Sequence, residues 1–232
     1  MACLLSPMIV ARLCAPVALG LVTVVAAPIA HAPAAQVTLA ETGSTLIYPV
    51  FRIWAAEYPK THRGVTVSAT ATDSGAGVAQ AISGAAQIGA SDAYMSDAQV
   101  RDNPLIINVP VAISAQTVNY NVPDLNRQNL KLDGPTLAGI YSGKIHSWDD
   151  PAIAVTNGGV KLPHNAIVPI RRSDASGDTF IFTQYLTFTT PSWEYSPGYG
   201  TTIAWPAAPN ASTADGNAGM IVKIHDTPYS VG

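Results

Sequence analysis

The chain has 232 residues, of which 12% are charged, and a formal net charge of -3 at pH 7. This balance lacks the clustered Lys and Arg that nucleic acid or anionic lipid requires, so we expect no nucleic-acid partner, although a single buried anion site remains open. The length allows one large domain or two small ones.

The first 35 residues have the pattern of an export signal. Arg12 precedes an apolar run over 16–27, and Ala30-His31-Ala32 matches the small-x-small rule of signal peptidase. A membrane anchor is the alternative, but the run is short and Pro28 interrupts it. We therefore expect residues 1–35 to be a signal peptide and the protein to be exported, to the periplasm or the cell surface.

Both cysteines, Cys3 and Cys14, lie within this signal segment, so the rest of the sequence contains no thiol and no disulfide. A lipid-attachment cysteine follows the apolar run, whereas Cys14 precedes it. The sequence therefore does not support a lipid anchor, and we expect a soluble or peripherally associated protein.

After the signal, short apolar segments alternate with amphipathic patterns, which indicates an α/β architecture. In chain order we expect a strand at 37–40, a helix at 45–58 that ends before Pro59, a strand at 65–72, a helix at 74–85 and a strand at 86–93. An extended segment at 105–122 is too long for one compact strand and can pass between two lobes. Next we expect helices at 135–142 and 150–155, a strand at 166–170, a helix at 176–188, a loop at 191–209 and the start of a strand at 229–232.

Three turns share one design, in which a strand ends, small polar residues follow and a helix begins. They lie at 43–45, 72–77 and 173–178. A helix start leaves backbone N–H groups unpaired and carries partial positive charge, so an oxyanion fits there. Ser and Asp at these positions are also ordinary helix caps. Three such turns, together with the Arg171-Arg172 pair, favour an anion site.

Five stretches carry a resemblance to a known family: 41–49 (ETGSTLIYP), 74–77 (SGAG), 88–93 (IGASDA), 148–151 (WDDP) and 171–180 (RRSDASGDTF). In this order they resemble the phosphate-binding proteins of phosphate ABC transporters, the PstS family, and look closest to its mycobacterial and actinobacterial branch. The similarity runs almost continuously from residue 37 to residue 232.

The resemblance implies a type II periplasmic solute-binding fold, with two lobes joined by a hinge. We expect lobe I over 36–112 and lobe II over 113–232, with the second lobe and the return segment incomplete. Apolar surface that longer members bury would then be exposed. No cofactor is implied.

The resemblance also implies a set of phosphate ligands, namely Thr45, Leu46, Ser74, Asp92, Arg172, Ser176, Gly177 and Asp178. Arg172 would supply a fixed fork of donors matched to two phosphate oxygens. Asp92 would accept the proton that hydrogen phosphate carries and sulfate lacks, so sulfate would leave two acceptors facing each other.

Three neighbouring residues have roles that the sequence leaves open. Asp73 stands where the family usually has glycine, and it either caps the following helix or weakens phosphate binding. Asp178 stands where some members have Thr, and we expect it to hold Arg172. Arg171 is expected to be structural, because adjacent strand residues face opposite sides.

We interpret the chain as a binding protein, not an enzyme, that takes inorganic phosphate outside the membrane and delivers it to the permease subunits of the transporter. One alternative is a phosphatase or serine-type hydrolase that uses the same anion site. The other is a surface antigen without a transport function. The histidines show no metal-ligand spacing and no pairing with Ser74 or Ser176 in the sequence, which disfavours catalysis.

Overall fold

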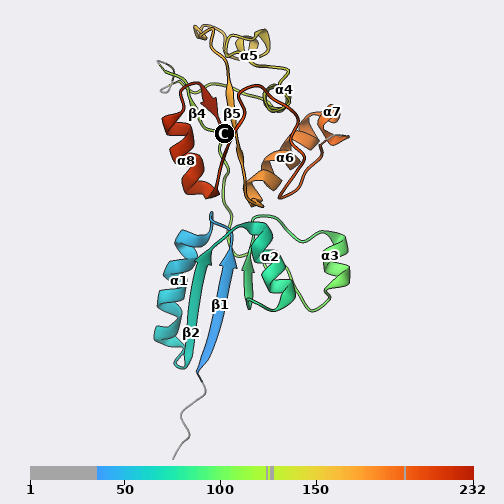
Figure 1. Cartoon of the computed structure of the whole chain (residues 1–232). Coiled ribbons are helices and arrows are strands. Elements are labelled where there is room, and N and C mark those ends of the chain that lie inside the picture. The colour runs from blue at the N-terminus through green and yellow to red at the C-terminus, as the bar shows by residue number, and fades with distance from the viewer. Residues whose placement is uncertain (1–35, 124, 126–127, 196) are drawn as a thin grey trace, which may run out of the picture. The chain divides into compact units, whose positions relative to one another are not determined.

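A computed structural model of the chain describes residues 36–123, 125, 128–195 and 197–232 (Figure 1). The predicted signal peptide, with Cys3 and Cys14, lies outside the described residues. The described chain contains two sheets with helices packed against them, which confirms the α/β prediction. Within this part of the chain, no helix has the length and apolar character needed to cross a bilayer.

The first sheet is parallel and has the strand order β2-β1-β3. Its elements are β1 (Val37–Gly43), α1 (Tyr48–Thr61), β2 (Val65–Ala71), α2 (Ser74–Ser83) and β3 (Ile88–Ala90), followed by α3 (Asp97–Asp102). α1 packs against β2, and α2 packs against β1 and β3. Because all three strands run in the same direction, the turns that follow them leave from one edge of the sheet.

The second sheet has the strand order β4-β7-β5-β6. Its elements are β4 (Tyr120–Asn121), α4 (Gly134–Tyr141), α5 (Pro151–Thr156), β5 (Val168–Arg172), α6 (Gly177–Thr189), α7 (Pro191–Glu194), β6 (Ser212–Ala214), α8 (Gly216–Asp226) and β7 (Ser230–Val231). β7 pairs antiparallel with β4 and parallel with β5. The strand expected at 229–232 is therefore present, and it lies inside the sheet.

The main apolar core belongs to this second sheet and its helices. Trp148 is fully buried and its indole N–H donates to the carbonyl oxygen of Tyr229 at 2.9 Å. Two residues further on, Asp150 caps α5 by accepting from the N–H of Ala152. The WDDP stretch thus supplies one core side chain and one helix cap.

Several element boundaries differ from the sequence expectations. α1 begins at Tyr48 instead of Thr45, because the preceding residues form a turn in which the hydroxyl of Ser44 accepts from the N–H of Leu46. Pro49 lies in the first turn of α1, where a backbone N–H has no partner within the helix and its absence costs nothing. The helix was expected to end before Pro59, but Pro59 lies inside it. β3 is only three residues long, shorter than the strand expected at 86–93, and the loop expected at 191–209 contains α7. The elements α3, β6 and α8 were not expected.

The segment between the two sheets exposes several large apolar side chains. Leu105 is 94% exposed, Ile107 76% and Ile113 102%, and no strand or helix is formed between α3 and β4. Residues 105–119 therefore form no regular element, and the end of the segment expected to be extended forms β4.

Candidate anion-binding site

The site is built where parallel strands end. β1 and β3 end together at the paired residues Gly43 and Ala90, and β5 and β6 end together at Arg172 and Ala214. Three helices begin close to these strand ends, at Ser74, Gly177 and Gly216. Free N–H groups at helix starts are a general means of binding oxyanions.

The turns of the first sheet contact those of the second directly. The N–H of Gly75 donates to the carbonyl oxygen of Ala175 at 2.9 Å. A Cβ atom on Gly177 would lie 2.4 Å from the Ser74 Oγ and 2.6 Å from the Asp92 Cβ. Only glycine allows this approach, so Gly177 brings together two segments about a hundred residues apart in the sequence.

Asp92 is held by two buried hydroxyl groups. Its Oδ2 accepts from the hydroxyl of Ser44 at 2.6 Å and from that of Ser74 at 3.2 Å. Ser44 and Ser74 are each 1% exposed. Among the described residues no hydrogen bond to the second carboxylate oxygen is formed, so Asp92 keeps an acceptor for a ligand. Ser44 was not predicted, although it stands directly before Thr45.

Arg172 lies at the centre of a buried charge cluster. Its Nε donates to Asp174 Oδ1 at 2.6 Å, and its Nη2 donates to the other oxygen of the same carboxylate. Its Nη1 donates to Asp178 Oδ2 at 2.7 Å and to Asn217 Oδ1 at 2.5 Å. The predicted contact between Asp178 and Arg172 is present, while Asp174 and Asn217 are partners that the sequence did not indicate.

The two carboxylates that hold Arg172 differ in acidity. Burial pushes the pKa of Asp174 upward, but the hydrogen bonds and charge of Arg172 together outweigh it, so this pKa lies below its ordinary value. Burial raises the pKa of Asp178, and the negative charges of Asp92 and Asp174 add to that rise against the opposing effect of Arg172. The site therefore has one buried guanidinium, that of Arg172, which forms hydrogen bonds with two carboxylates, Asp174 and Asp178.

Arg171 has different partners from Arg172, although both line the same cavity. Its Nη2 donates to the carbonyl oxygens of Tyr141 and Pro206, at 2.8 and 2.9 Å, and its guanidinium carbon lies 5.0 Å from the ring centre of Trp205. These contacts fit the structural role expected for Arg171.

The polar residues at the helix starts act as caps. Asp73 accepts from the N–H of Ala76 at 2.6 Å, which is the capping alternative for this residue. Ser176 accepts from the N–H groups of Asp178 and Thr179. Because these bonds use Ser176 as an acceptor, its hydroxyl hydrogen is available to an anion.

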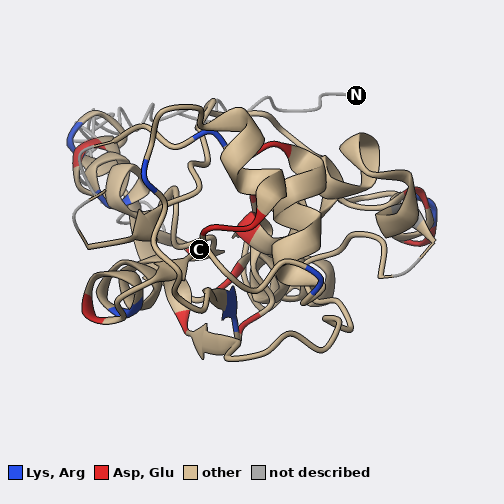
Figure 2. Cartoon of the chain, turned by 90° about the horizontal axis from the view of Figure 1, so that it is seen from above, with Lys and Arg blue, Asp and Glu red and all other residues tan. Residues whose placement is uncertain are grey.

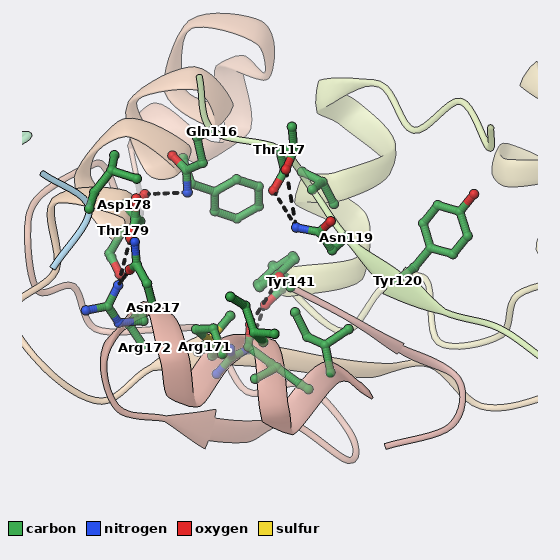
Figure 3. Close-up of a pocket in the computed structure, with 18 of the residues that line it drawn as sticks. Gln116, Thr117, Asn119, Tyr120, Tyr141, Arg171, Arg172, Asp178, Thr179 and Asn217 are labelled. Atoms are coloured by element: carbon green, nitrogen blue, oxygen red, sulfur yellow. Dashed lines mark hydrogen bonds and ion pairs between the residues drawn. The ribbon is translucent and has the colours of Figure 1, made fainter. Parts of the chain in front are cut away.

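The remaining predicted ligands, Thr45 and Leu46, lie in the turn after β1. Thr45 Oγ1 accepts from the N–H of Asn217 at 3.4 Å. Leu46, Arg172, Asp178 and Asn217 all line a cavity of about 700 Å³, part of which Figure 3 shows. In the same view Gln116 donates from its side chain to the carbonyl oxygen of Asp178 at 3.1 Å. All eight predicted residues thus lie at the ends of β1, β3 and β5 or at the starts of α2 and α6.

A family model described as a PBP superfamily domain matches residues 29–227. The chain belongs to the PBP superfamily. Similar relatives include the phosphate-binding protein PstS of Pasteurella multocida (strain Pm70), 35% identical over 195 residues that cover 84% of this chain and 55% of the relative. The mycobacterial branch is represented by the phosphate-binding protein PstS 3 of Mycobacterium leprae (strain TN), 34% identical over 79% of this chain and 50% of the relative.

The solved structures of the superfamily share the fold. The crystal structure of an ABC-type phosphate transport receptor from Vibrio cholerae has a TM-score of 0.53 and 19% identity, and the match covers 84% of this chain and 70% of that chain. The predicted periplasmic solute-binding fold is thereby confirmed. The chain spans about half the length of the curated relatives it matches.

Figure 2 shows Lys and Arg scattered over several elements. In the described part of the chain, no group of three or more His, Cys, Asp and Glu side chains is arranged to hold a metal ion.

Proposed function

We propose that the chain binds inorganic phosphate, as hydrogen phosphate, between the ends of β1 and β3 and the starts of α2 and α6. The observation that carries the proposal is the half-buried carboxylate of Asp92, held by two buried serine hydroxyls and left with one free acceptor beside the Arg172 cluster. Relatives that are 35% and 34% identical are named phosphate-binding proteins, which supports it.

The remaining groups would complete the anion shell with donors. Arg172 is immobilised by Asp174 and Asp178, so its guanidinium keeps a fixed orientation. Ser176 offers its hydroxyl hydrogen, and Thr45 and Gly177 would offer backbone N–H groups. The N–H of Leu46 donates to Ser44 in this structure and would have to exchange that bond for one to the anion. In this arrangement residues 36–112 and 113–232 form the two lobes, which close on the anion.

The biological step follows from this binding. We propose that the exported protein takes phosphate outside the membrane and delivers it to the permease subunits of a phosphate ABC transporter. We propose no reaction in which a covalent bond is broken. The two candidate serine nucleophiles have other roles, because Ser74 donates a hydrogen bond to Asp92 and Ser176 caps α6. His164 and His225 bond to Asp149 and Asp226 instead. Turnover of a phosphomonoester by the purified chain would contradict this assignment.

Calorimetric titration with phosphate and with sulfate tests the proposal. The unaltered chain should bind phosphate in strong preference to sulfate. Asp92→Asn replaces the acceptor by an amide that can donate to sulfate, so the ratio of the two affinities should collapse. An unchanged ratio in this variant would refute the role of Asp92, and the absence of phosphate binding would refute the function.

A further inference from the structure

Asn217 is the second residue of α8 and connects three parts of the site. Its side-chain Oδ1 accepts from Arg172 Nη1 at 2.5 Å, and its backbone N–H points to Thr45 Oγ1 at 3.4 Å. The preceding N–H, of Gly216, points to Oδ1 of Asp174, the carboxylate that holds Arg172, at 3.3 Å. The start of α8 therefore contacts both the guanidinium cluster and the turn after β1.

The contact with Arg172 determines which way the Asn217 amide points. A guanidinium can only donate hydrogen bonds, so the amide oxygen must face it and the NH₂ group must face away. Within the described residues no partner for this NH₂ group is recorded. Asn217 lines the same 700 Å³ cavity as Leu46, Arg172 and Asp178, and Figure 3 shows it beside Arg172 and Asp178, so the two free N–H donors belong to the proposed anion site.

The charges of the site explain why a neutral donor is useful there. Arg172 already donates to two carboxylates, and Asp92 adds a further negative charge close to Asp178. A second cation would bind these carboxylates in competition with the ligand. An amide supplies donors for an anion and an acceptor for Arg172 without changing the net charge.

We propose that Asn217 is a further anion-binding residue, whose Nδ2 group donates to an oxygen of the bound phosphate while its Oδ1 orients Arg172. This inference rests on the proposed function, because it assigns a residue to the same site. It adds the start of α8 to the strand ends and helix starts already assigned.

Two substitutions separate a ligand from a purely structural residue. Asn217→Ala removes both the donor and the acceptor, and phosphate affinity should fall about 10- to 100-fold, the range for losing one hydrogen bond to a charged group. Asn217→Asp keeps an acceptor for Arg172 but places a negative charge where the donors were, so its affinity should fall further than that of the alanine variant. An aspartate variant that binds at least as well as the alanine variant would show that Asn217 only holds Arg172.

The measurement is calorimetric titration of the full chain with inorganic phosphate, accompanied by thermal melts without phosphate. Asn119→Ala is the matched control, because Asn119 lines the same cavity but donates to Thr117, and it should leave phosphate affinity within about twofold. Asn217→Ser, which keeps one small donor, should give an intermediate loss and serves if the aspartate variant does not fold.

Each outcome decides the inference. The inference is supported if phosphate affinity decreases in the order Asn, Ser, Ala, Asp at position 217. The melting temperatures of the variants without phosphate should then stay close to that of the unaltered chain. Unaltered affinity in the Asn217 variants, or an aspartate variant that binds as well as the alanine one, overturns it while the proposed function stands. If the unaltered chain itself does not bind phosphate, the proposed function and this inference both fail.

Discussion

Glu41 offers a test of the electrostatics within the first sheet. It lies on the central strand β1, is 2% exposed, and neither carboxylate oxygen meets hydrogen-bond geometry with another described group. Burial raises its pKa from the ordinary value of 4.5 to about 7, and the backbone of Thr70 offsets only part of this rise. The folded state therefore holds the Glu41 proton more tightly than the unfolded state does.

The sign and size of the effect on stability follow from this difference. At a pH below 4.5 the carboxyl group is protonated in both states and costs nothing through ionisation. As the pH rises from 4.5 to about 7 only the unfolded state releases the proton, so the free energy of unfolding falls. A pKa difference of this size lowers the free energy of unfolding by about 3 kcal/mol. The full decrease is reached above pH 7 and stays constant at higher pH.

Glu41→Gln removes this ionisation while keeping the size of the side chain. Urea unfolding of the chain and the variant at pH 5 and pH 8 should show the variant gaining stability mainly at pH 8, by up to about 3 kcal/mol. Glu57→Gln is the control, because Glu57 is exposed and its pair with Lys60 is a surface ion pair, worth under about 1 kcal/mol. An equal stability difference at both pH values would show that Glu41 is ionised in the folded state and that the reasoning is wrong.

Four further substitutions test the site. Arg172→Ala should cost about 2 to 5 kcal/mol of phosphate binding, as expected for a desolvated charge pair, whereas Arg171→Ala should lower stability and leave affinity nearly unchanged; equal losses in calorimetry would refute the distinction. Gly177→Ala should abolish phosphate binding, because its Cβ would lie 2.4 Å from the Ser74 hydroxyl, and a variant that binds normally would show that this approach is not required. Asp73→Ala should reduce stability in urea by about 1 kcal/mol through loss of the cap without weakening phosphate affinity, and weaker binding would indicate that Asp73 contributes to the site.

Much of the site could be predicted because its signals are local. A strand, a small polar turn and a helix start lie within about ten residues of one another, so the turns at 72–77 and 173–178 were identifiable from the sequence. The capping role of Asp73 and the contact of Asp178 with Arg172 are also short-range, at three and six residues. Resemblance to a family supplied Asp92, whose isolated sequence context carries no such signal.

Element boundaries depended on interactions that a sequence pattern does not contain. The strand at 86–93 was overestimated because pairing with β1 ends at Ala90. The apolar positions of α8 were not recognised as a helix, and therefore the residues at its start were not considered for the site.

The sequence alone determined the α/β alternation, the turn chemistry and the order of the proposed anion-binding segments, since each arises from neighbouring residues. Only the tertiary structure decided which side chains hold those groups in place. Asn217 reaches Arg172 because β6 pairs in parallel with β5 and ends opposite it. Ser44 reaches Asp92 because β1 and β3 end side by side. These pairings join residues about forty-five positions apart, and the spacing of side chains along a single segment cannot encode a contact that strand pairing creates.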